Sequence, residues 1–92
     1  MGEKSFFDLC KKEIVKYVNL DAETNEIDLD NVFVVWWCKT LQNCKALLST
    51  DIEGDHRYYE CTYNGDKKEL YVDVYIKKVN YKVNIDCNWI IN

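Results

Sequence analysis

The 92-residue chain has no proline, three glycines and a single histidine. It is not a disordered chain, because 14% of its residues are aromatic. One histidine leaves little scope for a Ser–His or Cys–His catalytic pair. No apolar run reaches the roughly 18 residues of a membrane helix, and the first twenty residues lack the apolar core of a signal peptide. We therefore expect one cytoplasmic, non-enzymatic domain over residues 1–92.

The five cysteines do not form a metal-binding motif. No pair has the C-x-x-C spacing of zinc and redox sites, and with one histidine a zinc site would need almost all of its ligands to be thiolates from distant segments. Their number is odd and no export signal precedes them, so reduced thiols acting as small hydrophobic side chains are expected. The sequence predicts no metal and no cofactor. The residues are Cys10, Cys38, Cys44, Cys61 and Cys87.

The net charge is −4, and most of it lies in one segment. Residues 21–55 hold eight acidic side chains and two lysines, a net charge of −6 for that segment. Nucleic-acid binding is not expected, because it depends on cations that neutralise phosphates. An acidic patch is suited to a basic surface on another protein. Its predicted members are Asp21, Glu23, Glu26, Asp28, Asp30, Asp51, Glu53 and Asp55.

Residues 5–18 carry an apolar stripe at three- and four-residue steps, which predicts an amphipathic helix. Ser5 and Asp8 have the spacing of a capping box, which places the start of the helix at Ser5. We expect the stripe to cover a sheet. Residues 19–31 are polar and acidic and are predicted to be a connector.

From Val32 onward the apolar residues alternate, which predicts strands. The pair Asn64-Gly65 predicts a hairpin between the third and fourth strands, and a loop longer than two residues avoids placing Glu60 opposite Glu69. The predicted fold is α+β, with the N-terminal helix packed on an antiparallel meander of four to five strands within residues 32–92. The strand candidates are 32–39, 45–50, 57–63, 69–77 and 79–86.

The alternation also predicts the faces of the sheet. Tyr59 and Cys61 should share one face with the aliphatic residues of the fourth strand, and three tyrosines should share the other. These outward tyrosines are Tyr58, Tyr71 and Tyr75.

The run VFVVWWC, residues 32–38, is apolar on both faces. Such a strand is expected in the middle of a sheet with both faces covered. The helix can cover only one face. Of Trp36 and Trp37, we therefore expect one to pack in the core and the other to be available for an interface.

The turn after this run is polar. Its side chains can hydrogen-bond to neighbouring backbone, or they can present amide and ammonium groups to a ligand, and the sequence leaves both interpretations open. The ligand-binding candidates are Lys39, Thr40, Asn43 and Lys45.

The words W-x-C-K-T-L-Q-N-x-K-A-L-L-S-T, from Trp36, and Y-Y-E-x-T-Y-N-G-D-K, from Tyr58, resemble an uncharacterised family of small proteins from phages and prophages of Gram-positive bacteria. The resemblance implies a protein of phage origin that acts in the cytoplasm of a bacterial host. It implies no biochemical activity, because that family is a domain of unknown function.

These features favour a small interaction protein, for example an inhibitor of a host or anti-phage defence protein. Its aromatic anchors would be Trp36 or Trp37 together with the outward tyrosines, rimmed by acidic groups. A narrower version is mimicry of DNA by the acidic patch. Two alternatives are a protein that sequesters a nucleotide-like signal, with the pocket at a homodimer interface, and an accessory protein of phage replication.

Overall fold

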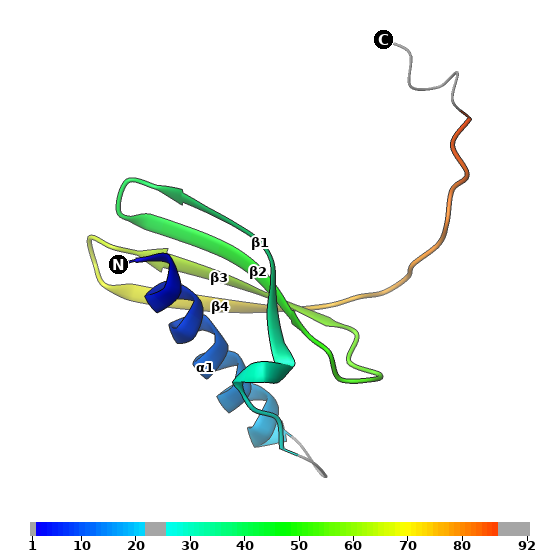
Figure 1. The fold of residues 1–92 in the computed structure, drawn as a ribbon, viewed down its shortest axis with the longest axis horizontal. Helices are drawn as coiled ribbons and strands as arrows, with labels where there is room; N and C mark the ends of the chain where they lie inside the picture. Colours follow the sequence, from blue (N-terminus) through cyan, green and yellow to red (C-terminus); the bar gives the residue numbers. More distant parts are fainter. Residues whose placement is uncertain (1, 22–25, 87–92) are drawn as a thin grey trace.

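The computed structural model describes residues 2–21 and 26–86 of the chain. Within them the fold is α+β, as the sequence predicts: one N-terminal helix lies on a four-stranded antiparallel meander of order β1-β2-β3-β4 (Figure 1). No helix in these two ranges is long and apolar enough to cross a membrane. The elements are α1 (Glu3–Asp21), η1 (Leu29–Asn31), β1 (Val32–Thr40), β2 (Asn43–Thr50), β3 (Arg57–Asn64) and β4 (Glu69–Ile76).

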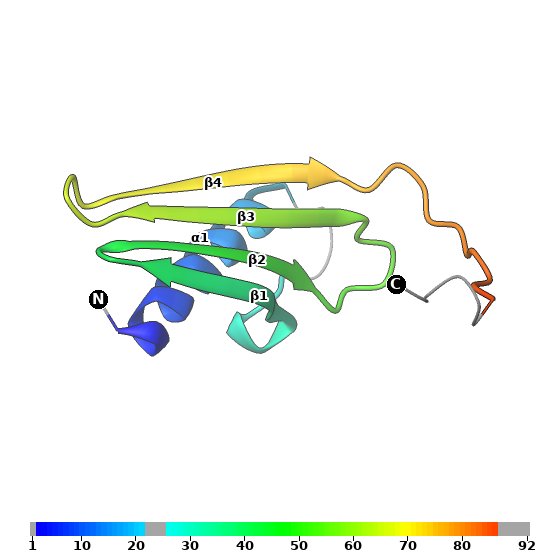
Figure 2. The same cartoon turned by 90° about the horizontal axis from the view of Figure 1, so that it is seen from above.

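Helix α1 lies along one face of the sheet (Figure 2), and the core lies between them. Apolar residues at every fourth position of α1 are buried, because a four-residue step returns to nearly the same side of a helix. They pack on the alternate residues of β2 and β3 that point towards the helix. The buried set is Phe6, Cys10, Ile14 and Val18 from α1, and Val32, Cys44, Ala46, Leu48, Tyr59 and Cys61 from the sheet.

The helix begins at Glu3, so the predicted capping box is wrong. Ser5 lies inside the first turn, and the first backbone bond of the helix runs from the amide of Phe6 to the carbonyl of Gly2. The helix also continues to Asp21, into the predicted connector. The rest of that connector includes the 3-10 turn η1, which is capped by the side chain of Asp28.

Strand β1 forms an edge of the sheet, so the predicted central position is wrong. A meander places its first strand at an edge, because each later strand is added on the same side. The strand has a bulge between Val34 and Trp36, where pairing with β2 shifts by one residue. A bulge bends an edge strand and disfavours pairing with another strand.

The two hairpin turns pack side by side at one end of the sheet. The β3–β4 loop has four residues, 65–68, which confirms the longer of the two predicted loops. A Cβ atom on Gly65 would lie 2.3 Å from the carbonyl oxygen of Gln42. Gln42 also donates a hydrogen bond of 2.8 Å to Asp66, and the Gly65 amide donates one of 3.2 Å to Asn43. Gly65 is therefore required by this close approach between the turns.

The predicted fifth strand is wrong: residues 79–86 form no strand in the structure. The amide of Lys77 still donates to the carbonyl of His56, and beyond it the chain leads away from the sheet (Figure 1). The two residues between β4 and this segment, Lys77 and Lys78, are not the glycine or asparagine that a tight turn prefers. We call residues 79–86 the tail.

Candidate functional site

The face of the sheet opposite α1, which we call the open face, carries half-exposed aromatic side chains. No element among the described residues covers it (Figure 2). Exposed fractions are 45% for Trp36, 56% for Tyr71 and 51% for Tyr75. Soluble proteins rarely leave aromatic side chains gathered on one face unless the face contacts something else. The large apolar and aromatic side chains on the open face are those of Phe33, Trp36, Leu47, Tyr58, Tyr71 and Tyr75.

The strand register brings these side chains together. Residues paired across an antiparallel sheet lie on the same face. Tyr58 is paired with Tyr75, and Trp36 with Leu47, so the open face receives large apolar side chains from all four strands. The predicted outward tyrosines are therefore placed on one surface.

Charged groups on the open face are mainly acidic. Glu60 lies beside its cross-strand partner Asp73, and Lys45 forms an ion pair of 3.5 Å with Glu60. The hydroxyl of Tyr71 donates a hydrogen bond of 2.6 Å to Glu69, and this bond raises the pKa of Tyr71. Glu60, which is paired with a lysine, therefore lies among the aromatic side chains, whereas Asp73 and Glu69 lie at the β4 edge of the open face.

Trp36 and Trp37 lie on opposite faces of the sheet. Trp37 points to the helix side, where its ring meets that of Phe7 edge-on at 5.4 Å between centroids. It remains 39% exposed, because it lies on the edge strand, so the prediction that one of Trp36 and Trp37 packs in the core is wrong. Trp36 lies on the open face and is the tryptophan available to a partner.

The four polar candidates from the β1–β2 hairpin are divided between the faces. Lys39 is paired with Cys44 on the helix side, whereas Thr40, Asn43 and Lys45 lie on the side of Trp36. The structure therefore does not bring all four to one ligand. Lys39 instead borders a hollow of about 430 Å³ at the hairpin turns, together with Leu41, Gln42, Tyr63, Gly65 and Lys68.

Part of the predicted acidic patch gathers at the opposite end of the sheet. The side chain of Asn31 donates a 3.0 Å hydrogen bond to Asp51, and the Asp51 amide donates to the Asn31 carbonyl. These bonds join η1, with Asp28 and Asp30, to the end of β2. Glu26 and Glu53 are exposed. Glu23 and the side chain of Asp21 lie outside the part of the chain that the structure describes.

Asp55 was predicted to belong to the acidic patch, but its side chain is only 3% exposed. It accepts hydrogen bonds from Arg57, at 2.8 Å, and from the hydroxyl of Thr50. Burial alone would raise the pKa of Asp55, but these bonds outweigh it and lower the pKa. This carboxylate is a structural group, so its inclusion in a surface patch was wrong.

Around Asp55 lies a polar cluster that sequence reasoning missed. The guanidinium of Arg57 is 5.7 Å from the ring centroids of both Tyr17 and Tyr59. Burial, followed by the charge of Asp55, raises the pKa of Tyr59 to about 12. The cluster joins α1 to β3. The spacing Asp-His-Arg-Tyr-Tyr does not reveal it, because Tyr17 and Thr50 come from other elements.

Three cysteines lie in the core. A hydrogen bond with Cys61, together with burial, raises the pKa of Cys10, so the Cys10 thiol stays protonated at neutral pH. Cys44 is buried as well, whereas Cys38 is exposed on the open face. Across residues 2–21 and 26–86 no group of three or more Cys, His, Asp or Glu side chains is placed to hold a metal ion. Cys87 lies outside those ranges.

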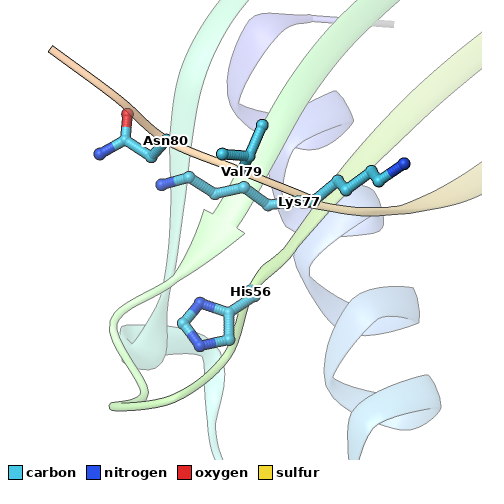
Figure 3. Close-up of a pocket in the computed structure, with 5 residues that line it drawn as sticks. His56, Lys77, Val79 and Asn80 are labelled. Carbon is cyan, nitrogen blue, oxygen red and sulfur yellow. The ribbon is translucent and has the colours of Figure 1, made fainter.

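A second hollow, of about 350 Å³, lies where the tail leaves β4 (Figure 3). His56 and the chain from Lys77 to Asn80 line it. Figure 3 shows His56 on the loop below the departing segment. Cys61 points into the core from β3, so it does not reach this surface histidine as a catalytic partner.

The chain matches a known protein family. The model of a family described as a family of unknown function (DUF6275) matches residues 7–85. No curated protein and no solved structure matches the chain.

Proposed function

Because this chain belongs to DUF6275, a family of unknown function, we propose its role from its surface: a non-enzymatic protein-binding domain whose open face receives a partner protein. The observation that supports this proposal is the set of half-exposed aromatic side chains on an uncovered sheet face. Trp and Tyr supply most of the binding energy in many protein interfaces, because they bury large areas with few rotatable bonds.

The charges indicate the chemistry of the partner. Asp73 and Glu69 border the open face, and the carboxylates of Asp28, Asp30 and Asp51 lie at the η1 end of the sheet. The matching surface has an apolar centre and lysines or arginines around it. We place the partner among host or anti-phage defence proteins of a Gram-positive bacterium, in keeping with the resemblance of the two sequence words to phage proteins.

The test is capture from a Gram-positive lysate with three forms of the tagged protein. We expect the wild-type chain to retain one stoichiometric protein and the triple variant W36A/Y71A/Y75A to lose it. The matched control is L20A/L41A, which removes two side chains that are each 84% exposed and lie away from the open face. Retention of the same protein by the triple variant would exclude the open face as the binding surface.

The hollow beside Lys39 supports a second candidate function, binding of a small anionic ligand. Its volume of about 430 Å³ falls in the range of ligand pockets, and Lys39 and Lys68 bring two ammonium groups to it. Ultraviolet absorbance of the purified protein above that of its Tyr and Trp residues, lost in the variant Lys68→Ala, is the expected result. Absorbance of the wild-type protein that its Tyr and Trp residues fully account for would exclude a co-purifying nucleotide.

A further inference from the structure

The tail has the sequence of a strand, but it pairs with no strand among the described residues. Val79, Tyr81, Val83 and Ile85 alternate with polar residues, and each is at least 58% exposed. Strict alternation is typical of a strand with one buried face. The tail is eight residues long, the same length as β4.

The outer edge of β4 is also unpaired among the described residues. Its pairing with β3 is regular over all eight residues, without the bulge that interrupts β1. A regular, uncovered edge readily accepts another strand, whereas a bulged edge does so less easily. Of the two edges, β4 is therefore the better acceptor.

One antiparallel register fits the tail to this edge. When Ile76 lies opposite Val79, Asp73 lies opposite Lys82, an attractive cross-strand pair within the ladder, whereas the like charges Glu69 and Asp86 lie opposite one another only at its end. A shift of two residues in either direction would place Asp73 opposite Asn80 or Asn84 and lose that pair. In the favoured register every apolar residue of β4 meets one of the tail: Leu70 with Ile85, Val72 with Val83, Val74 with Tyr81 and Ile76 with Val79.

The same chain could satisfy this register only by a two-residue turn at Lys77 and Lys78. Two-residue hairpin turns need positive φ at one or both central positions, which glycine and asparagine adopt far more readily than lysine. The structure shows the alternative: the chain passes this point without turning back (Figures 1 and 3). A second copy can supply the same pairs without that turn.

We propose that the protein forms a strand-swapped homodimer, in which the tail of each copy pairs antiparallel with the outer edge of β4 of the other. Lys77 and Lys78 are the hinge. Each copy contributes two eight-residue segments, which satisfies both free β4 edges and covers the apolar side of both tails. Exchange of identical elements is an economical route to a dimer, because the contacts are those of the closed monomer. The dimer does not depend on the proposed partner-binding function.

The test uses two charge-reversal variants of the full chain, D73K and K82D. Alone, each places two like charges opposite one another at both exchanged edges. Mixed, they form a heterodimer in which both edges carry an attractive pair. We expect wild-type dimers in sedimentation equilibrium, dimers weakened about tenfold in each variant, and wild-type affinity in the mixture. A mixture no tighter than its components, or a wild-type chain that is monomeric throughout, would overturn the proposal.

A hinge variant gives a second test that does not depend on charge. K77N/K78G supplies a favourable two-residue turn, so the tail should close on its own β4 and the protein should become monomeric. The matched control K77A/K78A removes the same two charges without providing a turn. It should dimerise at least as tightly as the wild type. In the proposed dimer, Lys77 and Lys78 of one copy lie opposite Lys78 and Lys77 of the other, so the wild type brings four ammonium groups together at the twofold axis. A K77N/K78G protein that dimerises like the wild type would contradict the hinge. The monomeric K77N/K78G protein should still capture the partner through its open face. Failure of the proposed dimer can therefore be told apart from failure of the proposed partner-binding function.

Discussion

The two faces of the sheet are built from the same four strands, yet they differ in what they bury. Towards α1, Ala46, Leu48 and Cys61 are fully buried under the helical stripe. On the open face, Trp36 and Tyr75 remain about half exposed. A sheet face that only meets water usually carries polar side chains in these positions. The helix side therefore accounts for the fold, and the open face is the surface that the proposed binding function uses.

The largest effect should follow from a cavity on the helix side. Ile14 is fully buried between α1 and the sheet. Ile14→Ala should lower the free energy of unfolding by about 4 kcal/mol, because it removes buried methyl groups and leaves a void. Urea unfolding followed by circular dichroism measures this loss. An effect below that of the open-face variant Tyr75→Ala would contradict the assignment of the two faces.

The Asp55 cluster should come next. Asp55→Asn leaves the guanidinium of Arg57 without its carboxylate and should cost about 3 kcal/mol at pH 7. The folded-state pKa of Asp55 is lowered, so its stabilisation is present above the unfolded pKa of about 4 and is lost as the pH falls through the folded value. Unfolding of both proteins at pH 7 and at about pH 2 should show the difference shrinking with acid. A difference that stays constant would mean that the carboxylate charge does not contribute.

A smaller effect is expected at the contact between the two hairpin turns. Gly65→Ala places a methyl group against the backbone of Gln42 and should cost about 2 kcal/mol. The matched control is Gly2→Ala, which meets no atom within 4 Å. Thermal unfolding of the two variants checks this prediction. Equal melting temperatures would show that the turns do not pack as described.

The smallest effect on folding should come from the open face itself. Tyr75→Ala should change the free energy of unfolding by about 0.5 kcal/mol or less, because half of the side chain already lies in water. The same variant should weaken partner binding strongly. A large loss of stability with unchanged binding would reverse the roles given to the two faces.

The sequence predicted the parts of the fold that depend on periodicity. The helix, four strands, the longer β3–β4 loop and the two faces of β3 and β4 all follow from alternation of apolar residues, and the structure confirms them. The edge position of β1 could have been derived from the meander itself. The apolar run at Trp36 and Trp37 led to a wrong prediction of a central strand, because an exposed edge strand and a buried central strand can be built from the same residue types.

The sequence could not predict what depends on contacts between distant elements. The burial of Asp55 needs Thr50, Arg57 and Tyr59 in a single cluster. The need for Gly65 comes from Gln42 in another turn. Leu41, with φ of 57°, takes a left-handed position where a glycine is usual, so composition gave no signal for its turn. In the candidate site, the outward position of the tyrosines could be predicted from the alternation of apolar residues. The placement of Lys39 and Lys45 on opposite faces of the sheet could be seen only from the observed register.

The most direct measurement is the dissociation constant of the captured partner, purified, for the single variants Trp36→Ala on the open face and Leu41→Ala at the hairpin tip. Binding through the open face predicts an affinity about 30-fold weaker for Trp36→Ala, because central aromatic anchors contribute about 2 kcal/mol or more, and an unchanged affinity for Leu41→Ala. Equal affinities of Trp36→Ala and the wild type, together with a loss for Leu41→Ala, would contradict the account and move the binding surface to the hairpin turns.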